Sequence, residues 1–289
     1  MPLPATVDAL EAALAAHGYV PERSLSVATH LAIQMGKPLF VEGEPGVGKT
    51  EIAKVLAQIA GGELIRLQCY EGLDASHSLY EWDYARQMLA IRLLEASGES
   101  IEVSDIMGEE FLVARPLLEA VRKASAEEPI VLLIDELDRA DEEFEAYLLE
   151  FLSDFQITIP EVGTIRAAQA PLVVITSNRT RDIHDAVKRR CIYHWIDYPS
   201  LEREMEILAV KAPGTDERLA RELAAAMERF RSMDLFKPPG VAETIDWARA
   251  LSILEVGELS PEALDATLGV ILKYEEDVHA VRNESSSSA

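Results

Sequence analysis

The chain has 289 residues, of which 48% are apolar, enough for one large domain or for a large and a small one. Its net charge of −24, from 51 acidic and 27 basic residues, disfavours DNA or RNA as a partner, because the surface would repel phosphates. The sequence has no apolar run long enough to span a membrane and no basic start typical of a signal peptide, and its two distant cysteines, Cys69 and Cys191, favour a cytoplasmic location.

The chain begins with two predicted helices, at residues 5–17 and 22–36, and continues into a short apolar strand, "PLFVE". The next octet, "GEPGVGKT", fits the pattern G-x-x-x-x-G-K-[ST], and a helical pattern follows it. Glycines allow successive backbone N–H groups to turn inward around an anion, and the helix start adds positive charge. This strand–loop–helix predicts a phosphate-binding loop rather than a plain turn. Its residues are Gly43, Glu44, Pro45, Gly46, Val47, Gly48, Lys49 and Thr50.

Within this loop, the pattern assigns Lys49 to the β- and γ-phosphates and the hydroxyl of Thr50 to Mg²⁺. A second signal is the stretch "PIVLLIDELDRAD", whose continuous apolar run predicts a strand buried on both faces of a parallel sheet. It ends in Asp135 and Glu136. We expect Asp135 to hold Mg²⁺ through water and Glu136 to activate the water that attacks the γ-phosphate. Both acids would otherwise simply be a solvated strand end.

A third apolar strand, "PLVVITSN", ends in Asn178, which could position the attacking water or serve only in a turn. The stretch "DAVKRRC" then places Arg189 and Arg190 just before another apolar strand, "CIYHWIDYP". In a ring, such arginines could reach a neighbour's phosphate, where an arginine supplied in trans stabilises the transferring phosphoryl group. With Lys188 they could also be no more than a basic surface cluster.

The predicted strands are "PLFVE", "ELIRLQ", "IVLLID", "LVVITS" and "IYHWID", and the helical patterns between them indicate a three-layer α/β sandwich. After Pro199 only helical patterns remain, at 201–212, 216–234, 241–256 and 261–277. We therefore predict an α/β domain at 1–198, a helical lid at 199–281 and a disordered tail at 282–289. Trp82, Tyr84, Met88 and Leu89, in the insert after the second strand, belong either to the core or to an exposed loop that grips a partner. No metal-ligand spacing among the histidines suggests zinc.

"GEPGVGKT", "LLIDE", "ITSN" and "KRRC", in that order, resemble the AAA+ ATPases, and most closely their MoxR branch. "FQITIPEVGTIRAAQAPLVVITSN" looks like the hairpin of that branch, and "RLQCYEGLDASHSLYEWDYARQ" resembles its segment after the second strand. "SNRTRDIHDAVKRRCIYHWIDYP" is similar to the CoxD-like subgroup, which is tied to carbon monoxide dehydrogenase maturation. The resemblance covers residues 20 to 280 and implies a P-loop NTPase fold with a five-stranded parallel sheet in the order 5-1-4-3-2.

Residue by residue, the resemblance implies that Asp135 is the Mg²⁺ partner, Glu136 the catalytic base and Asn178 the first sensor. It also implies that Arg190 is the arginine finger, with Arg189 as the alternative. Gln68 stands where some members carry a polar residue that holds the catalytic glutamate inactive. The sequence departs from the family at the second-sensor arginine, because Glu243 occupies that place, with Lys237 or Arg249 as possible substitutes.

As a whole, the resemblance implies an ATPase that uses ATP and Mg²⁺, forms a ring, usually a hexamer, and remodels or matures a client metalloenzyme. A protein with a von Willebrand A domain is the expected partner. The alternative is a nucleotide-gated binding switch that hydrolyses little ATP. A DNA helicase or clamp-loader component shares the fold, but the net charge of −24 argues against it.

Overall fold

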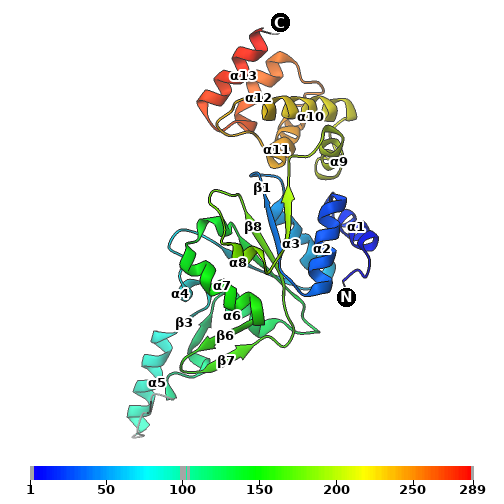
Figure 1. Ribbon diagram of the computed structural model, residues 1–289. Helices are drawn as coiled ribbons and strands as arrows, with labels where there is room; N and C mark the ends of the chain where they lie inside the picture. The colour runs from blue at the N-terminus through cyan, green and yellow to red at the C-terminus, as the bar shows by residue number, and fades with distance from the viewer. Residues whose placement is uncertain (1–2, 98–101, 103–104, 288–289) are drawn as a thin grey trace. The chain divides into compact units, whose positions relative to one another are not determined.

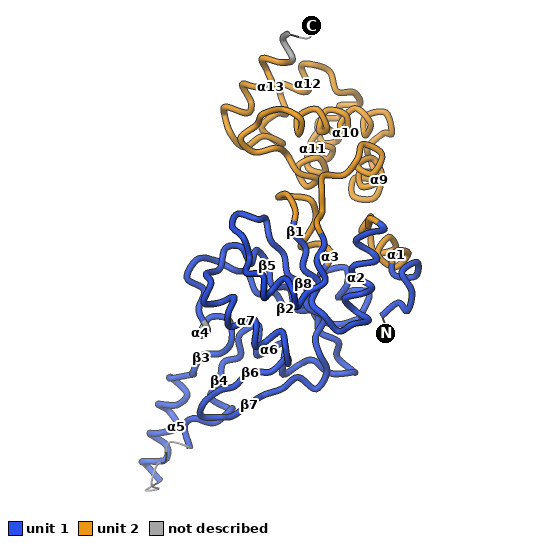
Figure 2. Tube along the Cα trace, in the orientation of Figure 1, with its two compact units in different colours: residues 1–10, 23–42, 53–194 blue, residues 11–22, 43–52, 195–289 orange. Residues whose placement is uncertain are grey.

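The computed structural model describes residues 3–97, 102 and 105–287, and its elements follow the chain from blue to red in Figure 1. The chain divides into two compact units (Figure 2). Unit 1 comprises residues 1–10, 23–42 and 53–194, and unit 2 comprises residues 11–22, 43–52 and 195–289. This division differs from the predicted boundary at residue 198, because unit 2 also takes in two earlier segments, one of which carries the glycine-rich octet.

A five-stranded parallel sheet forms the centre of the α/β part, in the order β2-β5-β8-β1-β9. The strands are β1 (Leu39–Gly43), β2 (Glu63–Gln68), β5 (Ile130–Asp135), β8 (Leu172–Ser177) and β9 (Ile192–Ile196). In chain order this is 5-1-4-3-2 read from the β9 edge, so the predicted topology is confirmed. The carboxyl ends of β5, β8 and β1 meet at one edge of the sheet, which is where ligands bind in open α/β folds.

Helices cover both faces of the sheet, and the strand β5, which is apolar up to Asp135, is buried on both of them. All six residues of β5 are buried. Leu132 and Ile134 belong to the core formed with α6 and α7, and Leu133 is buried on the opposite face. The helices up to β9 are α1 (Val7–Ala16), α2 (Arg23–Met35), α3 (Lys49–Ala60), α4 (Ala75–Ser78), α5 (Tyr84–Ser97), α6 (Pro116–Lys123), α7 (Glu142–Asp154) and α8 (Asp185–Lys188), with the 3-10 turns η2 (Glu109–Phe111) and η3 (Leu137–Arg139).

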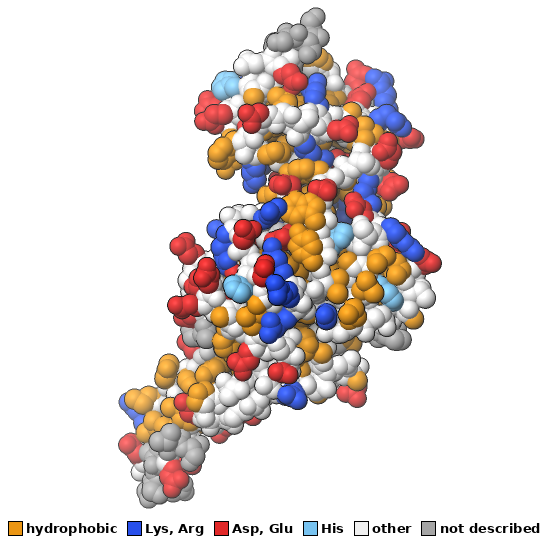
Figure 3. Space-filling model, in the orientation of Figure 1, with side chains coloured by type: hydrophobic (Ala, Val, Ile, Leu, Met, Phe, Trp, Pro, Cys, Tyr) orange, Lys and Arg blue, Asp and Glu red, His pale blue; other side chains and the backbone are white. Residues whose placement is uncertain are grey.

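Two antiparallel strand pairs interrupt the α/β pattern, and the second of them is the hairpin that the resemblance implies before β8. One pairs β3 (Tyr80–Trp82) with β4 (Leu112–Ala114), and the other pairs β6 (Gln156–Ile159) with β7 (Gly163–Arg166). Between β3 and β4 lies α5, which carries hydrophobic side chains on its surface (Figure 3). Of the two alternatives left open by the sequence, the core one holds for Trp82, whereas Tyr84, Met88 and Leu89 are exposed, on the helix α5 and not on a loop.

The C-terminal part is entirely helical, as the sequence predicted. Its helices are α9 (Leu201–Lys211), α10 (Glu217–Ser232), α11 (Val241–Ile253), α12 (Pro261–Ile271) and α13 (Glu275–Ser287). They pack around a core of their own, in which Trp247, Phe230 and Met227 are fully buried. Among the residues that the structure describes, no helix is both long and apolar enough to cross a membrane.

The last helical pattern, predicted as one helix at 261–277, forms two. Helix α12 ends at Leu272, whose backbone is extended and whose side chain is buried in the core of the C-terminal helices. The ammonium group of Lys273 donates to the carbonyls of Gly269 and Val270, which satisfies the end of α12. Helix α13 then continues to Ser287, so the segment predicted as a disordered tail is helical through that residue; 288–289 lie outside the described residues.

Candidate functional site

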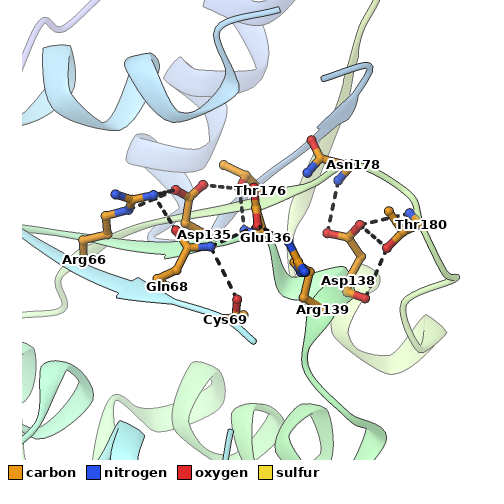
Figure 4. Close-up of polar contacts among 10 residues, drawn as sticks. All are labelled: Arg66, Gln68, Cys69, Asp135, Glu136, Asp138, Arg139, Thr176, Asn178 and Thr180. Carbon is orange, nitrogen blue, oxygen red and sulfur yellow. Dashed lines mark hydrogen bonds and ion pairs between the residues drawn. The ribbon is translucent and has the colours of Figure 1, made fainter. Parts of the chain in front are cut away.

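The carboxylate of Asp135 lies at the end of β5 and is almost fully buried, with 3% of its side chain exposed. Its Oδ1 atom accepts a hydrogen bond of 2.6 Å from the hydroxyl of Thr176 on β8. Its Oδ2 atom accepts from Arg66 on β2, at 3.0 Å from Nε and 2.6 Å from Nη2 (Figure 4). A buried carboxylate is costly unless it is paired and hydrogen-bonded, and these two partners meet that requirement.

Glu136 follows directly and has a left-handed backbone, with φ 56° and ψ 52°. A residue other than glycine in this region costs on the order of 1–3 kcal/mol, and such strain is concentrated at functional sites. Its backbone N–H donates to the hydroxyl of Thr176 at 2.9 Å, which fixes the turn. Its carboxylate is one-third exposed and accepts from the amide of Gln68 at 3.1 Å, with Arg139 at 3.6 Å.

Asn178 stands one residue beyond β8, and the buried carboxylate of Asp138 holds its backbone. Asp138 accepts from the N–H of Asn178 at 3.1 Å, from the N–H of Thr180 at 2.9 Å and from the hydroxyl of Thr180 at 2.7 Å. The side-chain amide of Asn178 points away from Asp138 in Figure 4. Within unit 1, therefore, β5 and β8 bring Asp135, Glu136 and Asn178 to the same edge of the sheet.

Sequence reasoning missed three residues of this cluster: Arg66, Asp138 and Thr176. Asp138 could have been suspected, because it follows Asp135 by one turn in "DELD". Arg66 and Thr176 reach Asp135 only through the pairing of β2 and β8 with β5. Cys69 lies next to the cluster, and burial, with the charge of Asp135 as the second cause, raises the pKa of its thiol to about 12.

The glycine-rich octet, in unit 2, forms a tight loop that leads into α3. Gly46 and Gly48 have left-handed backbones, with φ of 78° and 94°, which glycine adopts without strain. A Cβ at Gly43 would lie 2.2 Å from the carbonyl oxygen of Ile196, so no side chain fits there. The ammonium group of Lys49 is buried and donates to the carbonyls of Gly43, at 2.9 Å, and Glu44, at 2.7 Å.

The same loop contacts the start of α11, also in unit 2. The N–H of Ala242 donates to the carbonyl of Gly46 at 3.2 Å. The carboxylate of Glu243 accepts from the N–H of Gly240 at 3.0 Å and so satisfies a donor at the helix start. Glu243 therefore lies against the loop in the place of the expected arginine. The two predicted substitutes have other contacts: the N–H of Lys237 donates to Asp277, and the guanidinium of Arg249 donates to the carbonyl of Lys211.

The two arginines after α8 differ in their contacts. The guanidinium of Arg190 donates to the hydroxyl of Ser153 at 3.0 Å and to the carbonyl of Ala186 at 3.1 Å. The side chain of Arg189 is 82% exposed and approaches only the equally exposed Asp185, at 3.9 Å, within the described residues. Arg189 is therefore the more accessible of the two to a second molecule.

Oxygen donors suited to a hard divalent cation occur in both parts of the candidate site. The buried carboxylate of Asp135 already attracts a cationic partner, Arg66, and Thr50 contributes a hydroxyl at the start of α3. Carboxylate and hydroxyl oxygens are the ligands with which proteins hold Mg²⁺ beside nucleotide phosphates. The carboxylate of Asp135 and the hydroxyl of Thr50 are therefore each of a chemical kind that fits that ion.

The fold and the glycine-rich loop define a P-loop NTPase. Residues 39–196, more than half of the chain, match the family described as "ATPase family associated with various cellular activities (AAA)". The chain belongs to this AAA ATPase family. Membership implies that it binds a nucleotide, usually with Mg²⁺, and proteins of this class commonly assemble into rings.

The known relatives are distant. The uncharacterized protein YehL of Escherichia coli (strain K12) is 26% identical over 190 residues, which cover 62% of this chain and 47% of YehL, so this chain spans about half the length of that relative. The uncharacterized protein SERP0979 of Staphylococcus epidermidis is 23% identical over 260 residues, which cover 86% of this chain and 90% of the relative. Among solved structures, a Thermotoga maritima RuvB variant aligns with a TM-score of 0.51 at 18% identity, covering 92% of this chain and 72% of RuvB. That likeness concerns the fold alone.

Proposed function

We propose that this chain is a Mg²⁺-dependent ATPase that assembles into a ring and uses ATP hydrolysis to remodel a client protein. The observation that carries the proposal is Glu136, a carboxylate held in a strained backbone directly after the buried Asp135. Solvated strand ends have no need for such strain, whereas a catalytic base needs a fixed position. The AAA family match covers this segment together with the glycine-rich octet.

The octet binds the phosphates of ATP through its backbone N–H groups and Lys49. In the structure the ammonium group of Lys49 bonds to the carbonyls of its own loop, so it is already turned inward and exchanges these acceptors for phosphate oxygens. When Mg²⁺ is bound, it neutralises charge on the β- and γ-phosphates. Asp135 and Thr50 would be ligands of that ion, Glu136 would accept the proton of the attacking water, and Asn178 would orient that water.

An arginine from the neighbouring subunit completes each site. Arg190 lies two residues before the strand β9 and matches the arginine finger by position, whereas the side chain of Arg189 extends into solvent. Either guanidinium would stabilise charge on the transferring phosphoryl group, a contribution worth roughly 10³–10⁵ in turnover in other phosphoryl-transfer enzymes. The ring, proposed to be a hexamer, follows from this sharing of sites between subunits.

The client is proposed to be a metalloenzyme, in the manner of the MoxR branch and its CoxD-like subgroup. Support comes from the stretch "SNRTRDIHDAVKRRCIYHWIDYP", which is similar to that subgroup, and from the β6–β7 hairpin at the place that the resemblance to the branch implies. A molybdenum enzyme similar to carbon monoxide dehydrogenase is the candidate client, and a protein with a von Willebrand A domain is the candidate partner. We place this activity in the cytoplasm.

One observation favours a second function, a nucleotide-gated switch with little hydrolysis. Gln68 holds the carboxylate of Glu136, and Arg66 holds that of Asp135, so both acids have protein partners in this arrangement. Such a protein would bind ATP, change its affinity for a partner and hydrolyse slowly. The two functions make the same prediction for ATP binding and different predictions for turnover.

The experiment that tests the proposal is ATP turnover by the purified chain with Mg²⁺, measured per subunit over a wide range of protein concentration. Shared sites predict a rate per subunit that rises with concentration and then levels off, as neighbours complete each site. A measurable rate that does not change with concentration would exclude sites completed by a neighbour. A rate near zero at all concentrations would favour the switch.

The variant Glu136→Gln separates the two functions further, because it removes the proton acceptor and keeps the size of the side chain. Loss of a general base lowers turnover by about 10²–10⁴-fold, while ATP binding through Lys49 should remain. Lys49→Ala is the matched control and should lose ATP binding itself. If Glu136→Gln turns over ATP at the normal rate, Glu136 is not the base.

A further inference from the structure

Glu42 has a buried carboxylate at the end of β1, directly before the glycine-rich octet. The residue is 1% exposed. The hydroxyl of Ser177 donates to its Oε1 atom at 3.2 Å, and the ammonium group of Lys188 lies 3.5 Å from its Oε2 atom. Tyr193 on β9 hydrogen-bonds the same carboxylate; burial first, and then this hydrogen bond, raise the pKa of Tyr193 to about 12, so its hydroxyl remains a donor. Four segments of unit 1 therefore meet at one carboxylate.

Two partners of Glu42, Ser177 and Lys188, each stand beside a residue of the candidate site. Ser177 directly precedes Asn178, and its hydroxyl also accepts from the N–H of Arg179 at 3.0 Å. Lys188 is the last residue of α8 and directly precedes Arg189 and Arg190. Glu42 itself directly precedes Gly43. The carboxylate of Glu42 thus links three points of the chain. One lies at the start of the glycine-rich loop, one directly before Asn178 and one directly before the two arginines.

The ammonium group of Lys188 contacts two aromatic rings in addition to the carboxylate of Glu42. The Nζ atom of Lys188 lies 5.8 Å from the ring centre of Phe40 and 6.0 Å from that of Tyr193, so it packs over two aromatic faces as well as against the carboxylate. Only 27% of its side chain is exposed. Since α8 is a short helix of four residues, this anchor restricts the position of the segment that follows it.

We propose that Glu42 and Lys188 form a positioning link that sets the orientation of the Arg189–Arg190 segment toward the nucleotide of the neighbouring subunit. The proposal rests on the proposed function, in which one of these arginines acts in trans. According to this proposal, Lys188 contributes to ATP turnover at the site of the neighbouring subunit and not at the site of its own subunit. A displacement of about 1 Å in a catalytic group can cost on the order of 10²-fold in rate, so loss of this anchor should be visible in turnover.

The test uses mixtures of two inactive variants of the full chain. The reference mixture combines Lys49→Ala, which keeps the arginines but binds no ATP, with a double variant, Arg189→Ala and Arg190→Ala, which binds ATP but lacks the arginines. The test mixture replaces the double variant with Lys188→Met. Lys188→Met alone should bind ATP with an affinity within about twofold of wild type and should turn over on the order of 10²-fold more slowly. Mixed with Lys49→Ala, it should recover activity as the reference mixture does.

Three further variants serve as controls. Lys123→Met removes an exposed lysine of α6, which pairs with Glu63, and should leave turnover unchanged. Lys188→Arg keeps the charge and should retain a large part of the activity. Lys188→Met could fail to fold because it leaves the carboxylate of Glu42 buried without its cation. In that case the double variant Glu42→Gln/Lys188→Met, which removes both charges, replaces Lys188→Met in the mixture.

The outcomes separate the two proposals. Recovery in both mixtures supports the link. Recovery in the reference mixture alone overturns it, because Lys188 would then be needed within its own subunit, and normal turnover by Lys188→Met alone overturns it as well. If the reference mixture itself stays inactive, the shared site of the proposed function fails, and the link fails with it.

Discussion

Arg66 is the cationic partner of Asp135, the most deeply buried acid of the candidate site. Its guanidinium makes two hydrogen bonds with Oδ2 of Asp135 and one with Gln68, while about half of its own side chain remains exposed. A bound Mg²⁺ would compete for the same carboxylate. Arg66 therefore either leaves Asp135 when Mg·ATP binds or shares the carboxylate with the ion.

The variant Arg66→Met tests this competition. Removing the guanidinium should lower the Mg²⁺ concentration needed for half-maximal turnover by several-fold, because Arg66 would no longer compete with the ion for the buried carboxylate of Asp135. The measurement is a Mg²⁺ titration at fixed ATP, with nucleotide-dependent thermal stabilisation as a second readout. Arg115→Met, which removes an exposed arginine paired with Glu81 on the β3–β4 hairpin, is the control. A higher Mg²⁺ requirement in Arg66→Met would mean that Arg66 supports the ion rather than competing with it.

Among the elements, α11 has the most direct contact with the glycine-rich loop. A Cβ at Gly240 would lie 2.6 Å from the carbonyl oxygen of Pro45 and 2.8 Å from Cα of Gly46. The backbone of Gly240 has an ordinary conformation, with φ −88°, so glycine is required there by space and not by its dihedral angles. The start of α11 and the loop therefore pack backbone against backbone.

The variant Gly240→Ala should separate these two backbones. Overpacking at such a contact costs about 1–3 kcal/mol, which corresponds to roughly ten- to a hundredfold weaker ATP binding if the loop bears the strain. The measurement is the dissociation constant for ATP, with circular dichroism to establish that the fold is intact. Gly257→Ala is the matched control, because a Cβ at Gly257 meets nothing within 4 Å. Equal affinities for the two variants would show that the contact with α11 does not hold the loop.

The elements also mark where sequence reasoning succeeds. The octet and the "LLIDE" strand are local patterns, so their residues and the strands that carry them were predictable. The order of the sheet followed only from the resemblance to the AAA+ ATPases. The pairing of Arg66 with Asp135 depends on β2 lying beside β5 with Gln68 opposite Asp135, a register that no single segment contains. The break at Leu272 was missed for a similar reason: its helical pattern continues, and burial of Leu272 in the core of the C-terminal helices is what ends α12.

For the whole molecule, charge decides between functions that the fold leaves open. The fold is similar to that of RuvB, and that likeness concerns the fold alone. This chain carries a net charge of −24, with 51 acidic against 27 basic residues. Binding to duplex DNA draws most of its non-specific affinity from lysines and arginines that displace counterions from phosphates. The same fold can therefore serve different partners, and charge is the property that distinguishes them.

We expect no saturable binding of the wild-type chain to duplex DNA, even at about 50 mM salt, where electrostatic attraction is strongest. The measurement is filter binding or fluorescence anisotropy with a labelled duplex, with and without ATP and Mg²⁺. ATP turnover under the same conditions should not change when DNA is added. Because salt screens the attraction between a local basic patch and DNA phosphates, any weak association of electrostatic origin would disappear as salt rises. Saturable binding, or turnover stimulated by DNA, would instead mean that a local basic surface outweighs the net charge, and the client would then have to be sought among nucleic-acid complexes.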